Sequence, residues 1–492
     1  MSQIAQPQGL GTVVFTTAAD DYPAPSNRAP KFFGDNRAAR RVVDRLTYGF
    51  TRYEMDLLRY KGLEGYIRYH LNPAGIDDSA LDAYIAANYP ALVMTPQVLS
   101  TQQSGDLFNQ MVRSRLMRAV FSRRQLFERL VECWTDHFNI WIRDNPPSFL
   151  KVADDRDVIR ASALGTFPTL LRASAHSPAM LTSLNNDTNT AAAPNENYAR
   201  ELMELHSLSV TGGYSQSDVQ QVARCFTGWT YISAAGATQW QFRFNSGVHA
   251  TGSKTVLGQV IPYQSGASGQ QEGETVLNIL ADHPSTRSFV AYKLLRFFHS
   301  HTPAQSDIDA VAQIYASTGG DIKAMLDHVL HKAVALAAPP KFKRPMHLLA
   351  STLRALSAKV VFPNNLQNPL AAAGHTPFDW QAPDGYPDSL QAWSALLLAR
   401  WNFGSSLMNN EYGNPTSNPP TNVSALYTDT VGDAVTAAAV VDAIDAAAFQ
   451  HTMPKAERDA LLAYLTPASN PGSTKIREAM GMAVAMPSFQ WY

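Results

Sequence analysis

The sequence lacks several features that would assign a chain to a common class of protein. Its two cysteines, Cys133 and Cys225, exclude a disulfide framework and disfavour a cysteine-based zinc site. It has no run of about 18 uninterrupted apolar residues, so a transmembrane helix is not expected. The 40 basic residues nearly balance the 41 acidic ones, so neither nucleic acid nor an anionic membrane surface is favoured as a partner.

Common catalytic signatures are missing as well. No glycine-rich loop suited to a phosphate and no Gly-x-Ser-x-Gly turn occurs, which leaves nucleotide binding and α/β-hydrolase chemistry unsupported. No His-x-x-x-His or Glu-x-x-His pattern marks a metal site, so we predict no cofactor and no metal ligands. A divalent metal held by side chains from different elements stays an open alternative. The N-terminal segment, as written, shows no export signal.

The sequence does have helical periodicity over most of its length. Apolar residues recur at three- and four-residue spacing, which predicts a mainly α fold with one large multi-helical domain at 37–408. We expect an extended arm at 1–36, a Pro- and Asn-rich loop at 409–423, and C-terminal helices at 424–492 packed on the main domain. The helical segments are 77–94, 105–143, 155–183, 196–229, 272–300, 306–335 and 341–358.

Two regions interrupt the helical pattern. After Trp229, aromatic and polar residues alternate between glycines as far as about Pro262, which predicts one or two short β-hairpins. Residues 360–390 are rich in Pro, Gly and Asn and contain "GHTPFDWQAPDGYPDS". Because long loops in compact domains tend to be functional or disordered, the aromatic residues here favour ordered loops with a function.

The segment "PNENYARELMELHSLSV" at 194–210 predicts a helix with one unusual residue. Its apolar face carries Leu205 and Leu208, and Glu201 projects between them. A carboxylate on an apolar face must be neutralised, hydrogen-bonded, paired or metal-bound, so Glu201 has either a structural partner or a functional role. Glu196, Arg200 and Glu204 fit i,i+4 ion pairs on a solvated surface, although Glu204 stands at the edge of the apolar face.

The segment 123–145 places His137 at the centre of the apolar face of a second helix, with Glu128, Glu132, Asp136 and Asn139 on the opposite, wet side. A lone histidine on such a face is more often a satisfied core residue than a ligand. Buried titratable groups nevertheless cluster at sites, so His137 and Glu201 are both candidates. His137, Glu201, Glu204, His206 or His249 could also converge on a metal.

The candidate substrate-binding residues are mostly aromatic or acidic residues of the loops. The segment "GHTPFDWQAPDGYPD" brings Trp380, Asp384 and Tyr386 close together in sequence, a composition that suits a sugar-binding cleft or, equally, a loop held by its own aromatics. The full set of predicted substrate-binding residues is Trp229, His249, Trp380, Asp384, Tyr386, Arg200 and Asn197.

The chain resembles the bacterial domain-of-unknown-function family 1800. The hallmark is "PNENYARELME" at 194–204, followed by Gly213-Tyr214 and by Thr227-Gly228-Trp229. The resemblance covers roughly residues 37–404, and His206, Ala250 and His375 depart from the family's pattern. The other matching blocks are "RLTYGF", "RRQLFERLVECWTDHFN", "LADHPSTRSFVAYKLLRFF", "KFKRPMHLLASTLRAL" and "APDGYPDSLQAW".

The resemblance implies architecture and an environment more than a reaction. Members are often exported and encoded beside a sulfatase-like protein, which implies a periplasmic or extracellular location, a carbohydrate or other envelope polymer, and a protein partner. The leading hypothesis is a carboxylate-dependent enzyme that acts on such a polymer, for example a glycan hydrolase. In this hypothesis Glu201 is the acid, Glu204 or Glu196 is the ionised partner, and His137 orients or shuttles a proton. The alternatives are a non-catalytic helical scaffold or partner of the sulfatase-like protein, and a metal-dependent enzyme with His and Glu ligands.

Overall fold

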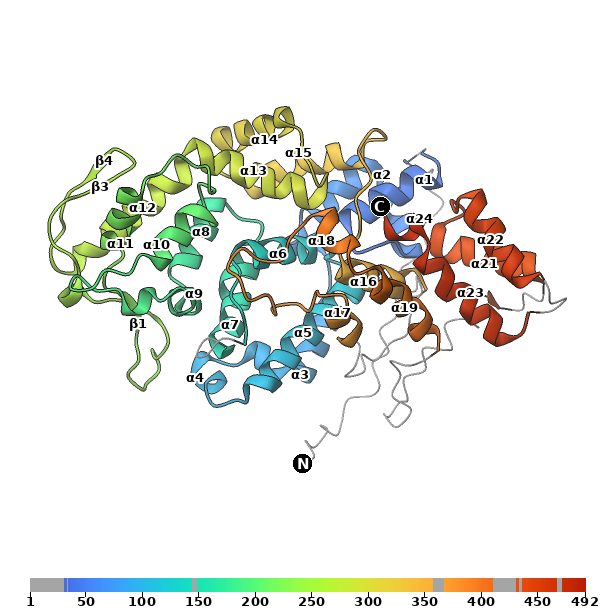
Figure 1. Cartoon of the computed structure of the whole chain (residues 1–492), viewed down its shortest axis with the longest axis horizontal. Helices are drawn as coiled ribbons and strands as arrows, with labels where there is room; N and C mark the ends of the chain where they lie inside the picture. Colours follow the sequence, from blue (N-terminus) through green and yellow to red (C-terminus); the bar gives the residue numbers. More distant parts are fainter. Residues whose placement is uncertain are drawn as a thin grey trace.

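Helices make up most of the structure, as the apolar spacing predicts, and the fold class is mainly α. The computed structural model describes residues 31–32, 34–143, 148–356, 367–409, 431–432, 436–466 and 471–492. Figure 1 shows an elongated arrangement with both hairpins at one end and the C-terminal helices at the other. The predicted arm at 1–36 lies largely outside the described residues, and the predicted loop at 409–423 almost entirely so.

The first group of helices includes α6, which packs against α1, α2 and α5. These helices are α1 (Asn36–Leu46), α2 (Arg52–His70), α3 (Ser79–Asn88), α4 (Pro96–Leu99), α5 (Ser104–Phe121), α6 (Gln125–His137), α7 (Ser148–Asp154), α8 (Phe167–Ala175) and α9 (Pro178–Ser183). A π-helix, η4 (Asp155–Arg160), continues α7.

The second group carries the family hallmark and the hairpins. Its helices are α10 (Asn197–Glu204), α11 (Gln216–Cys225), α12 (Gln270–Asp282), α13 (Pro284–Phe298), α14 (Gln305–Thr318) and α15 (Ile322–Val334). The two hairpins pair β1 (Trp229–Tyr231) with β2 (Phe242–Phe244) and β3 (Lys254–Val256) with β4 (Gln259–Ile261), both antiparallel. The prediction of short hairpins after Trp229 is therefore confirmed.

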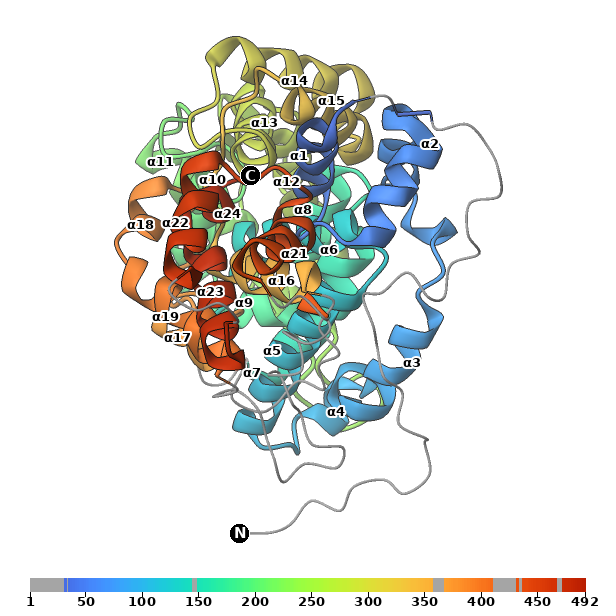
Figure 2. The same ribbon diagram turned by 90° about the vertical axis from the view of Figure 1, so that its right-hand side faces the viewer.

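The third group lies toward the C-terminus. It comprises α16 (Pro345–Ala355), α17 (Asn368–Ala372), α18 (Leu390–Ser394), α19 (Leu397–Met408), α21 (Ala437–Phe449), α22 (Lys455–Leu465), α23 (Ser473–Ala485) and α24 (Pro487–Gln490). Figure 2 shows α19 beside α23, and Gly404 and Gly481 lie where these two helices meet closely. Short 3-10 helices are η2 (Pro73–Gly75), η3 (Pro90–Val93), η5 (Asn186–Thr188), η6 (Ser246–Val248) and η7 (Gly266–Gly269).

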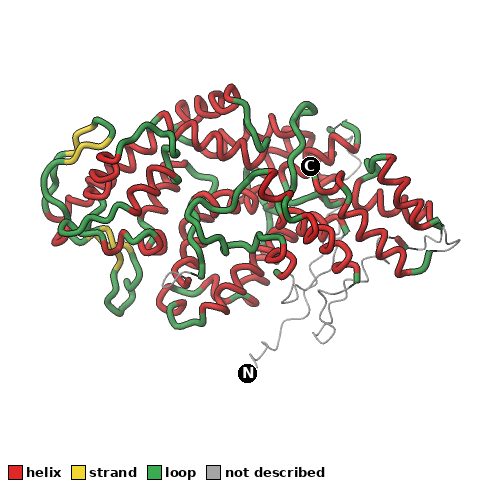
Figure 3. The backbone as a smooth tube through the Cα atoms, in the orientation of Figure 1, coloured by secondary structure: helices red, strands yellow, loops and turns green. Residues whose placement is uncertain are grey.

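One large hydrophobic core connects these groups, with residues from α1 through α24 in mutual contact. Figure 3 shows the loops that connect these helices. Within the described residues, no helix is both long and apolar enough to cross a membrane.

Helix α6 differs from the prediction, because the face expected to be wet is buried. Glu128, Glu132 and Asn139 are each less than a tenth exposed. Glu128 forms an ion pair with Arg160 at 2.5 Å, and Tyr48 donates a hydrogen bond to Glu132 at 2.6 Å. Neighbouring helices cover every side of α6, and cations from those helices compensate its acids, so the charged spacing did not mark a solvent face.

Candidate functional site

The asparagines of the hallmark segment hold the start of α10 in place. Asn189 accepts a hydrogen bond from the Asn195 backbone N–H at 2.9 Å, and Asn195 accepts one from the Asn197 N–H at 2.9 Å. Asn197, predicted to bind substrate, donates its side-chain amide to the Leu184 carbonyl at 3.2 Å. These amides satisfy backbone groups at the helix start, where intrahelical partners are lacking.

The helix itself is shorter than predicted, because α10 ends at Glu204 instead of continuing to residue 210. The Ser207 hydroxyl donates to the Leu202 carbonyl at 2.6 Å, and Leu208 N–H bonds to the Met203 carbonyl, five residues back. Ser209 has a φ of 73°. A side chain that competes for helix carbonyls, followed by left-handed backbone, ends the helix there.

Glu196 and Arg200 form the predicted surface ion pair. Arg200 Nη2 lies 3.0 Å from Glu196 Oε2, with both side chains at least a third exposed. Gln216 donates to the same carboxylate oxygen at 2.6 Å. Glu196 is thus occupied by partners on the surface, as the i,i+4 spacing suggested.

Glu201 remains the unusual residue of this helix. It is half-buried, and among the described residues its carboxylate has no hydrogen bond or ion pair. Burial raises the pKa of Glu201, the charges of Glu204 and Asp384 raise it further, and Arg200 lowers it. Glu204 itself accepts a hydrogen bond from the Tyr214 hydroxyl at 3.3 Å. The structure therefore places a partly exposed carboxyl group with a raised pKa in the field of two other acids.

Asp384 reaches this position from the loop between α17 and α18, which runs along the end of α6 (Figure 1). Asn139 holds the loop by donating to the carbonyls of Trp380 at 2.9 Å and Ala382 at 2.7 Å. Trp380 Nε1 donates to Asp384 Oδ1 at 2.9 Å, and the Asp384 side chain is exposed. Trp380 thus contacts Asp384, and its ring centroid lies 5.0 Å from that of Tyr386.

A buried charged cluster lies beside this loop. Arg344, at the start of α16, contacts Glu132 Oε1 at 3.0 Å and Asp136 Oδ2 at 2.6 Å. Burial raises the pKa of Asp136 to about 6, although Arg344 opposes that shift. Lys293 of α13 forms no ion pair with the described residues, and burial lowers the pKa of its amine while Asp136 and Asp384 counteract the effect. Lys293 and Asp384 therefore connect the cluster electrostatically to Glu201.

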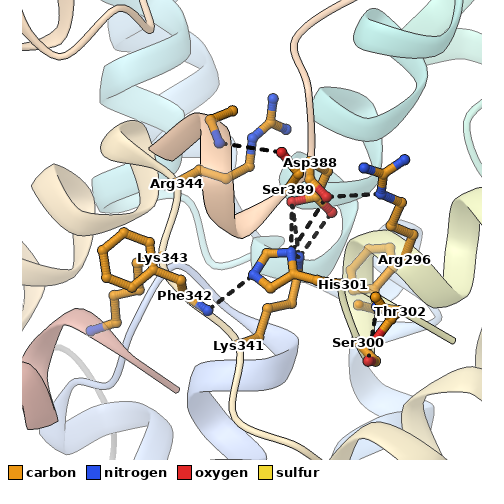
Figure 4. Close-up of polar contacts among 12 residues, drawn as sticks. Arg296, Ser300, His301, Thr302, Lys341, Phe342, Lys343, Arg344, Asp388 and Ser389 are labelled. Carbon is orange, nitrogen blue, oxygen red and sulfur yellow. Dashed lines mark hydrogen bonds and ion pairs between the residues drawn. The ribbon is translucent and has the colours of Figure 1, made fainter. Parts of the chain in front are cut away.

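A second set of contacts fixes the end of the same loop, as Figure 4 shows. Lys341 Nζ lies 2.9 Å from both carboxylate oxygens of Asp388, and Arg296 donates to the Asp388 carbonyl at 2.8 Å. His301 Nε2 accepts from the Phe342 N–H at 3.3 Å, so its other ring nitrogen carries the proton of the neutral ring. Burial lowers the pKa of His301 to about 4. These contacts make the loop a fixed part of the site.

Three residues predicted to bind substrate are in the core. Trp229 is 0% exposed and packs edge-on against Phe226, so its ring has no free face for a sugar. His249 Nε2 lies 3.2 Å from the fully buried carboxylate of Glu272. Tyr386 is 8% exposed, and its hydroxyl donates to the Thr376 carbonyl at 2.6 Å. Their burial does not fit the predicted contact surface, because Trp229 and His249 pack under the hairpins and Tyr386 packs against its own loop.

His137 approaches α10 without meeting the Glu201 carboxylate. Its Nε2 donates to the His206 carbonyl at 3.2 Å, and Nδ1 has no partner among the described residues. Burial lowers the pKa of His137 well below its usual value, so the ring is neutral at pH 7. The ring braces the turn that ends α10.

The side chains considered as metal ligands do not gather at one point. His249 belongs to the group with Lys254 and Glu272 under the second hairpin, whereas His137 contacts the backbone of the turn after α10. Across the part of the chain that is described, no group of three or more His, Cys, Asp or Glu side chains is arranged to hold a metal ion.

Gly385 determines how closely the loop approaches α6. Its φ is 73°, and a Cβ placed there would lie 2.0 Å from the Asp136 carbonyl oxygen. We expect Gly385→Ala to lower the free energy of unfolding by about 2–3 kcal/mol, since left-handed strain and a backbone clash both act. Gly213→Ala is the control, because Gly213 has a φ of 84° with nothing within 4 Å. Equal losses in the two variants, measured by urea unfolding, would contradict the close contact.

The fold and site define a mainly α protein with a partly exposed glutamate that has no partner among the described residues and that is linked through Asp384 to a buried charged cluster. A family model described as "Protein of unknown function (DUF1800)" matches residues 41–491, and the chain belongs to this family. No curated protein and no solved structure matched the chain. The match extends the sequence resemblance through the C-terminal helices.

Several residues of the site were not singled out from the sequence. The helical spacing predicts a wet surface at Glu132 and Asp136, and no sequence pattern predicts Arg344 or Lys293 as site residues. The available signal was the i,i+4 repeat of acids at 128, 132 and 136 together with the basic segment "KFKR". Their pairing depends on tertiary contacts between α6, α13 and α16, which local spacing does not encode.

Proposed function

We propose that this protein is an enzyme that cleaves a polysaccharide or another envelope polymer by carboxylate general acid–base catalysis, with Glu201 as the acid. The observation that carries the proposal is the raised pKa of a half-exposed carboxyl group that has no partner among the described residues. A structural acid would be paired, as Glu128 is with Arg160. An acid whose pKa is raised and that reaches solvent holds its proton more strongly than an ordinary carboxyl group and can donate it to a leaving oxygen.

Asp384 is the second carboxylate of the proposed mechanism. It is exposed, and its charge acts on Glu201. In the reaction, Glu201 donates its proton to the bridging oxygen of the polymer as the bond to carbon breaks, and the Asp384 carboxylate accepts a proton from the attacking water. Glu204, which also acts on Glu201, is the alternative base. The half-exposed ring of Trp380, oriented by its hydrogen bond to Asp384, offers a surface for an apolar sugar face.

The direct test is Glu201→Gln, assayed for release of reducing ends from a panel of purified polysaccharides and peptidoglycan. We expect a loss of about 10²–10⁴-fold in rate with an unchanged urea midpoint, because the amide cannot donate the proton. Glu196→Gln is the matched control on the same helix, since Glu196 only forms surface contacts. Retained cleavage by correctly folded Glu201→Gln would refute the mechanism.

The second candidate is a non-catalytic scaffold for an exported sulfatase-like partner. It is supported by the burial of Trp229, His249 and Tyr386, which serve packing. For this candidate we expect no cleavage of any substrate in the panel, and an effect of surface variants on partner binding. The metal-dependent alternative lacks a suitable set of ligands among the described residues. A periplasmic or extracellular location is part of both proposals.

A further inference from the structure

A cavity of about 660 Å³ lies between the α18–α19 segment and the α23–α24 segment. Figure 1 shows α19 and α23 far from α10, the helix that carries Glu201. Ser394 and Gln490 are the polar members of its wall. The remaining wall residues are Phe342, Leu390, Leu397, Trp401, Met482, Ala485, Met486, Pro487 and Trp491. A concave, mostly apolar site of this volume is typical of small-molecule binding.

The rim of the cavity exposes large apolar side chains to solvent. Trp401 is 50% exposed, and Met482 is 38% exposed. Leu398, on the same helix as Trp401, is 68% exposed. Single exposed apolar residues are ordinary, but a group of exposed apolar side chains around a cavity indicates a site that binds apolar ligands. Methionine and tryptophan walls adapt to flexible chains as well as to rings.

A buried cation lies directly behind this wall. Arg400 is 2% exposed; its Nε donates to Gln490 Oε1 at 2.8 Å, and its guanidinium lies 4.2 Å from the centroid of the Phe342 ring. Among the described residues Arg400 has no carboxylate partner, and its Nη1 has no hydrogen bond. On another side it borders a void of about 10 Å³ lined by apolar residues such as Leu348. Its Nη2 donates to the Lys343 carbonyl at 2.6 Å, so neutral acceptors and an aromatic ring surround the cation, but no carboxylate among the described residues balances its charge.

We propose that the cavity binds a single-chain amphiphile with an anionic head, such as a medium-chain fatty acid. The apolar chain covers the exposed rim around Trp401 and Met482, and the carboxylate lies at the Gln490 end. There the uncompensated charge of Arg400 attracts an anion and repels a cation, because the surrounding medium is weakly polarisable. This site is independent of the acid–base chemistry at Glu201.

The test uses the full chain and three probes of equal chain length: decanoate, decan-1-ol and decyltrimethylammonium, all below their micelle concentrations. Trp401 and Trp491 line the cavity, so binding changes tryptophan fluorescence. We expect saturable binding of decanoate, weaker binding of the alcohol, and at least about 10-fold weaker binding of the cation. Equal affinity for decanoate and the cation would overturn the assignment of an anionic head.

A matched pair of variants locates the binding. Ala485→Phe fills the cavity and should abolish the decanoate response, whereas Ala87→Phe on the exposed face of α3 should leave it unchanged. Two other results would overturn the proposal. One is an unaltered decanoate response in folded Ala485→Phe. The other is the absence of decanoate binding. If the parent then sediments as a dimer and Ala485→Phe as a monomer, the face is assigned to a second copy of the chain.

Discussion

Replacing Lys343 with methionine is expected to raise the free energy of unfolding by about 3 kcal/mol at pH 6. Lys343 is 1% exposed and forms no ion pair with the described residues. Burial lowers the pKa of its amine to about 7; Asp44 opposes the shift, and Arg40 and Arg400 add to it. The difference from the ordinary 10.5 corresponds to about 5 kcal/mol. The lost contacts to Ser351 and to the Phe489 ring offset about 2 kcal/mol.

The pH dependence of this effect has a definite sign. Because the pKa of Lys343 is lower in the folded protein than in the unfolded chain, the unfolded chain binds the extra proton between about pH 7 and 10.5. The penalty for burying the charge is therefore complete below pH 7 and disappears as the pH rises through this window. Urea unfolding at pH 6, 8 and 10 should show that the advantage of Lys343→Met over the parent in free energy of unfolding becomes smaller as the pH rises. A variant less stable than the parent at pH 6 would contradict the assignment.

Lys341 is the matched control, two residues away and also buried (Figure 4). Its pKa is lowered to about 8, but it has Asp388 within 2.9 Å. Lys341→Met removes the cation and leaves Asp388 in the protein interior, so it is expected to destabilise the fold. If Lys343→Met raises the free energy of unfolding and Lys341→Met lowers it, the effect comes from an unpaired cation, because lost side-chain packing would lower it in both variants.

The sequence predicts much of the fold, because local spacing determines its helices and hairpins. The apolar periodicity identifies the helical segments, and α11 begins at a capping box formed by Ser215 and Asp218, a local pattern with a three-residue spacing. The alternation after Trp229 predicts the strands but not the burial of the Trp229 ring. That burial depends on α12, where Gly273 allows the ring to approach closely.

The site is less predictable than the fold. Glu201 is identifiable because a carboxylate stands among leucines, and its raised pKa agrees with that interpretation. The partners of α6 are not identifiable, because an acid repeat looks the same on a solvent face and under a layer of arginines. Arg344 lies more than two hundred residues from Asp136 along the chain, and only the fold brings them together. Lys293 likewise gives no local signal of a site, because in the sequence it is only a polar residue within an apolar helix.

Replacing Arg344 with methionine should have the largest destabilising effect of the variants considered, about 3–5 kcal/mol. Arg344 is 4% exposed and is the cation between Glu132 and Asp136. Methionine keeps most of the volume but leaves the two acids close together without a counter-ion, which is the costly way to break a buried pair. Arg200→Met at the surface pair is the control, with a loss expected below about 1 kcal/mol.

The effect of Arg344→Met should grow with pH. The pKa of Asp136 is already about 6 in the folded protein, above its ordinary 3.8, and it rises further once Arg344 is removed. The folded protein then binds more protons than the unfolded chain from about pH 4 upward, so its stability falls as the pH rises through a wider window than in the parent. Urea unfolding at pH 5 and pH 8 should show the larger deficit at pH 8.

Adding Glu132→Gln and Asp136→Asn to Arg344→Met should restore part of the loss, because the unpaired charges are then gone. A deficit independent of pH and unchanged in the triple variant would mean that Arg344 stabilises the fold by packing against Phe297 and Trp393 instead of by its charge.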